Sequence, residues 1–357
     1  MSRPIACLRD ESLADEVLRL AAVAQCPLDR VADPVELSAR WSGPPLVLVD
    51  DPASCRGLPK RESLLVIHAG PPPTAFLSAA YDAGATRVVC LPDDADWLQC
   101  AFADAVESPA GRAGPVLAVV GGTGGAGASV FAAALALTAL DAGEPTLLVD
   151  CDPLSGGLDL VLGTETTPGV RWPDIRLSSG RVSAASLHAA LPGRTKGNAR
   201  LTILSGARAG EGPTADAVSA VVAAGRRTGE TVICDLPRHP TEATRSALSS
   251  ADLVAMVVPA DIRSCAAAHR TMTTLRDHGA HPALVIRGPS PSRLTPQEIA
   301  KTLSTRLLAK YTFDRDLPRL IDQGLFHPRP SLTRAAKTVL RELTPNSPRA
   351  SPTPRHP

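Results

Sequence analysis

The sequence predicts an α/β protein with two successive domains, each built on a mostly parallel sheet with helices on both faces. Short apolar runs typical of strands alternate with segments of helical periodicity along nearly the whole chain, which indicates βαβ units. Several of these runs are almost continuously apolar, as expected of strands covered on both faces. A glycine cluster at 121–127 directly follows one run, so the second domain is predicted to be doubly wound, with a ligand site at its strand ends.

The composition is that of an ordinary soluble protein. The 357 residues suffice for two or three domains, with 44% hydrophobic and 20% charged residues. The net charge of +1 shows no basic excess of the kind common in nucleic-acid-binding domains. The N-terminal stretch M-S-R-P-I-A-C-L-R-D-E meets charge too soon to be a signal peptide, and no apolar run approaches the roughly 20 residues of a membrane span. We expect a cytoplasmic protein, at most peripheral to the inner face of the plasma membrane.

The eight cysteines form no C-x-x-C pair, and several lie in or at the end of apolar, strand-like runs. Buried, reduced thiols are therefore favoured over a disulfide framework or a zinc site. The cysteines are Cys7, Cys26, Cys55, Cys90, Cys100, Cys151, Cys234 and Cys265.

Residues 1–108 are predicted to form one compact α/β domain. Apolar runs predict its strands, and helical spacing predicts its helices. The strands are expected at 5–8, 45–49, 64–67 and 86–91. The helices are expected at 12–24, 74–83 and 95–106.

Residues 109–115 are a predicted linker because they are rich in proline and glycine. The second domain, residues 116–343, repeats the strand-helix alternation. Its strands are expected at 116–120, 146–149, 201–204, 231–234, 253–258, 283–286 and 306–311. Its helices are expected at 130–142, 214–227, 241–248, 262–277 and 296–304. Thr295 and Glu298 have the spacing of a capping box at the start of the last of these.

A final helix is predicted at 331–343. Leu332, Ala335 and Val339 share one face of it, and basic residues such as Arg334 and Lys337 lie elsewhere. Such a helix either docks on its own domain or lies on an anionic membrane. Its short length and its alanines favour docking. The proline-rich tail, residues 344–357, has no periodicity and is predicted to be disordered.

The glycine cluster is the strongest functional signal. The run V-L-A-V-V passes into G-G-T-G-G-A-G-A-S and then into a helical segment. Glycines at such a turn let backbone N–H groups converge on a phosphate at the helix N-terminus. Aligned with the P-loop pattern G-x-x-x-x-G-K-[ST], Ser129 takes the hydroxyl position and Ala128 the lysine position. The predicted phosphate-binding residues are Gly122, Thr123, Gly124, Gly125, Ala126, Gly127, Ala128 and Ser129.

Carboxylates follow two further predicted strands. T-L-L-V ends in D-C-D-P, which contains Asp150 and Asp152, and T-V-I-C ends in Asp235. Because the carboxyl ends of parallel strands share one edge of the sheet, these groups are expected beside the glycine loop. One carboxylate can hold Mg²⁺ and a second can orient an attacking water. We predict Ser129, Asp150 and Asp235 as Mg²⁺ ligands.

The second domain resembles the MinD/ParA family of P-loop ATPases, whose deviant loop reads G-K-G-G-x-G-K-[ST]. Every glycine and the hydroxyl are matched, but Thr123 and Ala128 replace the two lysines. The stretch D-C-D-P-L-S-G-G-L-D-L-V-L-G is similar to the family's switch segment. The resemblance implies that Asp152 positions water and that Asp235 is the second acidic residue, so both are predicted catalytic residues. Across 4–343 the chain is most similar to the CpaE-like branch and to actinobacterial septum-site-determining proteins.

The first domain resembles a flavodoxin-like, CheY-like receiver domain. Asp50, with Asp51 beside it, ends the third strand at the phosphoacceptor position, and Asp10 lies where a metal-binding acidic residue is found. His68 replaces the expected Ser or Thr, and Leu91 replaces the expected lysine. A pseudo-receiver used for docking is therefore favoured. The alternatives are a phosphorylatable receiver, or carboxylates that merely start loops.

The resemblance implies a regulator of septum-site selection or of polar secretion or pilus assembly. It would work with protein partners of that machinery and dimerise through its nucleotide face. Without the two lysines, ATP and Mg²⁺ binding with weak or no hydrolysis is expected. The alternatives are an active ATPase that uses another cation such as Arg238, and a nucleotide-independent adaptor in which the loop only serves packing. The neutral net charge argues against a DNA-binding partition protein.

Overall fold

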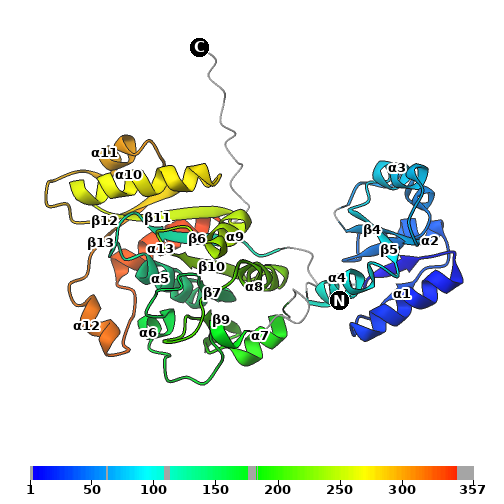
Figure 1. Ribbon diagram of the computed structural model, residues 1–357, viewed down its shortest axis with the longest axis horizontal. Coiled ribbons are helices and arrows are strands. Elements are labelled where there is room, and N and C mark those ends of the chain that lie inside the picture. Colours follow the sequence, from blue (N-terminus) through cyan, green and yellow to red (C-terminus); the bar gives the residue numbers. More distant parts are fainter. Residues whose placement is uncertain (1–2, 62, 108–112, 176–181, 183, 344–357) are drawn as a thin grey trace, which may run out of the picture. The chain divides into compact units, whose positions relative to one another are not determined.

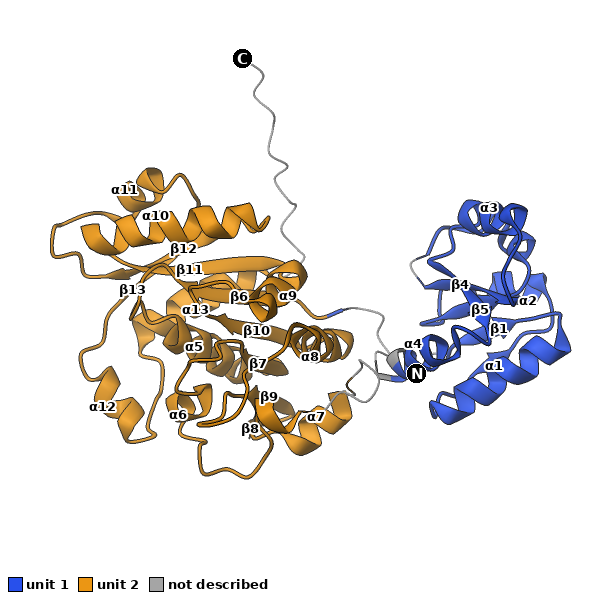
Figure 2. Ribbon diagram, in the orientation of Figure 1, with its two compact units in different colours: residues 1–113 blue, residues 114–357 orange. Residues whose placement is uncertain are grey.

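The computed structural model describes residues 3–61, 63–107, 113–175, 182 and 184–343. It divides into two compact units, residues 1–113 and 114–357, which are coloured separately in Figure 2. The tail that the sequence predicts to be disordered, and most of the predicted linker, lie outside the described residues.

The first unit contains a five-stranded parallel sheet in the order β2-β1-β3-β4-β5. This is the strand order of flavodoxin-like folds. The strands are β1 (Ile5–Cys7), β2 (Asp29–Arg30), β3 (Val47–Val49), β4 (Leu64–Ala69) and β5 (Arg87–Leu91). The edge strand β2 was not predicted, because its two residues are polar and carry no apolar run.

Helices cover both faces of this sheet (Figure 1). They are α1 (Glu11–Val23), α2 (Pro34–Ala39), α3 (Thr74–Asp82) and α4 (Ala95–Glu107), together with the 3-10 turn η1 (Pro52–Cys55). Helices α1 and α4 bury apolar side chains against one face, and α2 and α3 against the other. Helix α2 was also missed, although Asp33 caps it and Pro34 stands in its first turn.

The second unit contains an eight-stranded sheet in the order β13-β12-β11-β6-β10-β7-β9-β8. All neighbours are parallel except β8 and β9. The strands are β6 (Val116–Gly121), β7 (Thr146–Asp150), β8 (Gly193–Lys196), β9 (Ala199–Leu204), β10 (Thr231–Leu236), β11 (Leu253–Pro259), β12 (Ala283–Gly288) and β13 (Leu307–Thr312). The antiparallel edge strand β8 is polar and has no apolar run, so the sequence did not predict it.

Two apolar cores lie on the two faces of this sheet. Along β6, Leu117 and Val119 enter one core, and Val116, Ala118 and Val120 enter the other, as the period of two in a strand requires. Helices α5 (Ala128–Asp141), α6 (Leu158–Leu162) and α13 (Pro330–Glu342) contribute to the first core, with α12 (Leu317–Asp322) beside them. The second core is covered by α7 (Ala184–Ala190), α8 (Ala215–Arg227), α9 (Glu242–Ser250), α10 (Ile262–Asp277) and α11 (Pro296–Thr302), as Figure 1 shows.

Local sequence signals explain how two of these helices begin. Thr295 accepts a hydrogen bond from the Glu298 N–H, and the Glu298 carboxylate accepts one from the Thr295 N–H. The predicted capping box is therefore confirmed. Helix α5 begins at the glycine loop and is buried from Phe131 to Leu140, so its alanine-rich sequence allows close packing against several strands.

The terminal helix α13 docks on its own domain. It packs against α5 and β13, and its buried residues are Leu332, Ala335, Ala336 and Val339. The apolar face that could have met a membrane is therefore covered by protein. Among the residues the structure describes, no helix is long and apolar enough to cross a bilayer.

We predict that Val339→Asp lowers the free energy of unfolding by more than about 3 kcal/mol, because a carboxylate would be buried without a partner. Lys337→Asp, on the exposed side of the same helix, should change it by about 0.5 kcal/mol or less. Urea unfolding followed by circular dichroism measures both. Equal effects of the two substitutions would contradict the docking of α13.

Candidate functional site

The glycine loop connects the end of β6 to the start of α5. Gly125 and Gly127 have φ angles of 66° and 90°, in the left-handed region that favours glycine. A Cβ on Gly122 would lie 2.8 Å from the Ala268 Cβ and 2.8 Å from Val258 Cγ2. The glycines therefore serve both the backbone conformation of the loop and its close contact with α10 and β11.

A cavity of about 580 Å³ borders this loop, a size typical of small-ligand sites. Of the eight predicted phosphate-binding residues, seven line it: Thr123, Gly124, Gly125, Ala126, Gly127, Ala128 and Ser129. Gly122 faces α10 instead. The side chain at 128 is a methyl group, so the polar side chains that the loop brings to the cavity are those of Thr123 and Ser129.

Asp235, at the end of β10, lies beside the loop. Its carboxylate accepts a hydrogen bond from the Ser129 side chain, so the structure brings these two predicted residues together. Asp235 is buried and, like Asp150, does not itself line the cavity. Burial raises its pKa well above the usual value. The neighbouring Asp150 charge raises the pKa further, whereas the Ser129 hydrogen bond opposes the shift. A cation beside this carboxylate would stabilise its charged form.

Asp150, at the end of β7, has a different environment. Its Oδ2 accepts hydrogen bonds from Ser155 Oγ at 2.6 Å and from the N–H groups of Leu158 and Gly206, both at 3.3 Å. Its Oδ1 accepts one from the Asp152 N–H at 3.2 Å. The residue is fully buried and does not line the cavity. Burial raises its pKa, and its contacts organise the segment that follows β7.

Asp152 is the carboxylate of this segment that lines the cavity. Its Oδ1 accepts a hydrogen bond from the Leu154 N–H at 2.9 Å, which holds the side chain in a turn. Asp152 Oδ1 is thus bonded within the turn, and the carboxylate lies where it could contact a ligand at the glycine loop.

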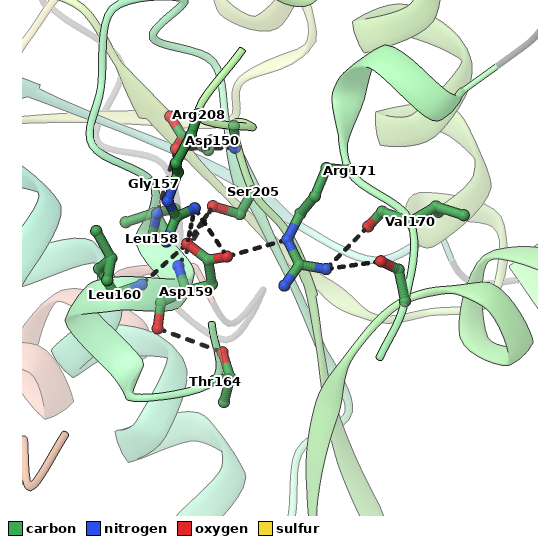
Figure 3. Close-up of polar contacts among 12 residues, drawn as sticks. Asp150, Gly157, Leu158, Asp159, Leu160, Thr164, Val170, Arg171, Ser205 and Arg208 are labelled. Carbon is green, nitrogen blue, oxygen red and sulfur yellow. Dashed lines mark hydrogen bonds and ion pairs between the residues drawn. The ribbon is translucent and has the colours of Figure 1, made fainter. Parts of the chain in front are cut away.

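A buried ion-pair network, not foreseen in the sequence, holds the segment after Asp152 (Figure 3). Asp159 Oδ2 is 3.0 Å from Arg171 Nε, and Asp159 Oδ1 is 2.9 Å from an Arg208 nitrogen. Ser205 Oγ donates to Asp159 Oδ1 at 3.1 Å. The Asp159 side chain is 1% exposed. The one available signal was an aspartate inside the apolar run L-D-L-V-L, which requires a buried partner.

The receiver-like carboxylates also lie together, at the carboxyl edge of the first sheet. Asp50 Oδ2 accepts hydrogen bonds from the N–H groups of Arg9 at 2.6 Å and Asp10 at 2.9 Å. Asp10 caps α1, and Asp51 caps η1 and pairs with Arg9 at 2.9 Å. His68 Nδ1 is 3.0 Å from the Gly70 carbonyl oxygen. These contacts account for Asp10, Asp51 and His68 by local structure. Asp50 Oδ1, in contrast, is buried and has no hydrogen-bond partner within the described part of the chain, and phosphorylation of Asp50 stays a hypothesis.

Breaking the Asp159 network should destabilise the protein. Asp159→Ala leaves Arg171, whose side chain is only 12% exposed, without its carboxylate partner. The Arg171 side chain keeps its bonds to the Gly169 and Val170 carbonyl oxygens but carries an uncompensated charge, so we expect a loss of about 3 kcal/mol. Arg208→Ala should cost about 1 kcal/mol or less, because that side chain is 46% exposed. Urea unfolding measures both, and a mild effect of Asp159→Ala would show that the network does not support this segment.

Asp235→Asn should stabilise the ligand-free protein. Because the folded state raises the pKa of Asp235, the wild type holds this proton more tightly when folded, so its stability falls as pH rises from about 4 to the raised pKa. The amide keeps an acceptor for Ser129 but has no charge to bury. The gain should be small near pH 4 and should grow as the pH rises toward 7, where the buried wild-type carboxyl costs most.

Asp150→Asn is the matched control for this substitution. Donors point at both carboxylate oxygens of Asp150, three at Oδ2 and the Asp152 N–H at Oδ1. An amide accepts through one oxygen only, and its NH2 group would face a donor, so we expect destabilisation. Thermal unfolding between pH 4 and 8 compares the two variants. A loss of stability in Asp235→Asn as large as that in Asp150→Asn would contradict the account of Asp235.

Comparisons with known proteins agree with both units. Residues 7–113 match the family described as the Rv3660c-like, CheY-like N-terminal domain. The protein Rv3660c of Mycobacterium tuberculosis (strain H37Rv) is 42% identical over 348 residues, which cover 94% of this chain and 96% of that protein.

Solved structures resemble the second unit. A ParA family ATPase from Chlorobium tepidum is 20% identical, with a TM-score of 0.55, over 64% of this chain and 98% of its own. The septum site-determining protein MinD from Pyrococcus horikoshii, complexed with Mg-ADP, is 20% identical, with a TM-score of 0.50, over 64% of this chain and 95% of its own. The second unit thus has the MinD/ParA fold that its glycine loop predicted. The chain belongs to the Rv3660c-like family, with a CheY-like domain followed by a MinD/ParA-like α/β domain.

Proposed function

We propose that the second domain binds ATP with Mg²⁺ at the glycine loop and hydrolyses it slowly or not at all. The observation that carries this proposal is the contact of Ser129 with Asp235 beside a cavity lined by the loop. A hydroxyl and a carboxylate are the oxygen ligands that Mg²⁺ uses together with nucleotide phosphates. A cation there would also relieve the cost of ionising the buried Asp235. The Mg-ADP complex of the Pyrococcus horikoshii protein with this fold supports the same ligand class.

Slow turnover follows from the loop's side chains. Thr123 and Ala128 carry no charge, and each donor lost from a transition-state site costs about 3–4 kcal/mol. Asp152 lines the cavity and would orient any attacking water. The bound nucleotide would therefore act mainly as a structural signal. Asp150 supports the site by ordering the segment after β7, and a part in Mg²⁺ binding remains a further hypothesis for it.

We further propose that the protein is a MinD/ParA-like regulator of septum-site selection, or of polar secretion or pilus assembly. The names of proteins with this fold, a ParA family ATPase and a septum site-determining protein, support such a role. The CheY-like domain would dock a protein partner of that machinery, and the nucleotide face would form a homodimer. The regulator would act in the cytoplasm or peripherally at the inner membrane face.

Calorimetric titration of Mg-ATP into the full chain tests the proposal. We expect one site per chain, with affinity lowered about tenfold or more by removal of Mg²⁺ or by Ser129→Ala, because each takes away a phosphate or metal contact. Asp152→Asn should keep the affinity within about threefold and abolish any residual phosphate release. Absence of binding by wild-type protein would favour the nucleotide-independent adaptor. Efficient turnover would favour an active ATPase.

A further inference from the structure

One arginine lies against the glycine loop next to the position of the missing lysine. Arg287 stands near the end of β12, and its side chain lines the cavity. A Cβ built on Gly127 would lie 3.4 Å from an Arg287 guanidinium nitrogen and 3.4 Å from the Tyr311 hydroxyl. Gly127 immediately precedes Ala128, so a guanidinium borders the loop where its own sequence offers no charge.

The other arginines of this cavity have partners. Arg329 pairs with Asp314 at 2.8 Å and with Asp316 at 3.2 Å. Arg238, the cation named from the sequence, is exposed and lies 3.1 Å from the His239 ring nitrogen.

Arg287 differs from these two. Its guanidinium lies over the Phe313 ring, 5.1 Å from the ring centroid. Within the described part of the chain, no carboxylate forms a salt bridge with it, and no acceptor takes a hydrogen bond from its side chain. Its N–H donors are therefore available to an anion.

The strand order places opposite charges on the two sides of the loop. The sheet reads β12-β11-β6-β10 through this region, so Arg287 comes from one side of β6 and Asp235 from the other. A phosphate chain in the loop would have the acidic, Mg²⁺-binding side at one flank and a guanidinium at the other. This is an arrangement suited to a polyphosphate with a bound cation.

We propose that Arg287 binds the polyphosphate of the nucleotide and stands in for the absent loop lysine. This inference rests on the proposed nucleotide binding and names the residue that makes it possible. The competing explanation is packing: the Arg287 side chain would cover Gly127 and stack on Phe313 without touching a ligand. The two explanations differ in what happens when the Arg287 charge is removed. Only phosphate binding predicts a lower affinity for tripolyphosphate, a ligand that has no base.

The test compares three variants of the full chain with wild type: Arg287→Gln, Arg287→Lys and Arg238→Gln, the last of which removes the competing cation at the same cavity. Mg-ATP and Mg-tripolyphosphate are each titrated by calorimetry, and a thermal melt verifies folding. We expect Arg287→Gln to weaken both ligands about 10-fold to 100-fold, because a charge-assisted phosphate contact is lost. Arg287→Lys should restore much of the affinity, and Arg238→Gln should stay within about threefold of wild type.

Three results would overturn this inference while leaving nucleotide binding intact. They are unchanged affinities in Arg287→Gln, a loss for Mg-ATP alone, which would place the guanidinium at the base, and a larger loss in Arg238→Gln. If Arg287→Gln does not fold, Arg287→Met takes its place, since it keeps an apolar contact with Phe313 but has no charge. The same loss of affinity for both ligands is then expected, and unchanged affinities would overturn the inference. Failure of wild-type protein to bind either ligand would instead overturn the proposed function itself.

Discussion

The site depends on the burial of Asp235 at the carboxyl edge of the second sheet. This carboxylate accepts a hydrogen bond from Ser129, has the charge of Asp150 nearby, and has a pKa raised mainly by its burial. Burying an ionisable group in this way costs folding free energy unless a proton or a cation accompanies it. Asp235 does not line the cavity itself, but its hydrogen-bond partner Ser129 does, and the proposed ligand, a magnesium nucleotide, would supply such a cation.

Packing and ligand binding share the same backbone in the glycine loop. Gly122 is required because α10 and β11 approach it closely, and Gly125 and Gly127 are required by their φ angles. An inert scaffold with the same loop would therefore need these glycines too, and the glycines by themselves do not indicate ligand binding. The functional interpretation depends on what surrounds the loop: Ser129 against Asp235 on one side and the Arg287 guanidinium on the other.

Apolar periodicity predicted most of both sheets, because strands covered on both faces leave long apolar runs. It missed β2 and β8, which lie at sheet edges and are polar. Glycine and aspartate patterns predicted that the loop, Asp152 and Asp235 lie close together, because each follows a strand of the same parallel sheet. Asp159 and Arg287 act through contacts with residues distant in the chain, and no local pattern identifies such partners.

The central claim is that a loop without lysine still binds a magnesium nucleotide. Hydrogen–deuterium exchange of the full chain, with and without saturating Mg-ATP, tests it directly at the backbone amides of residues 122–129. We expect slower exchange at these amides, together with slower exchange around Asp152, and no such change with Mg²⁺ alone. Unchanged exchange across the loop, or protection confined to the CheY-like domain, would contradict it.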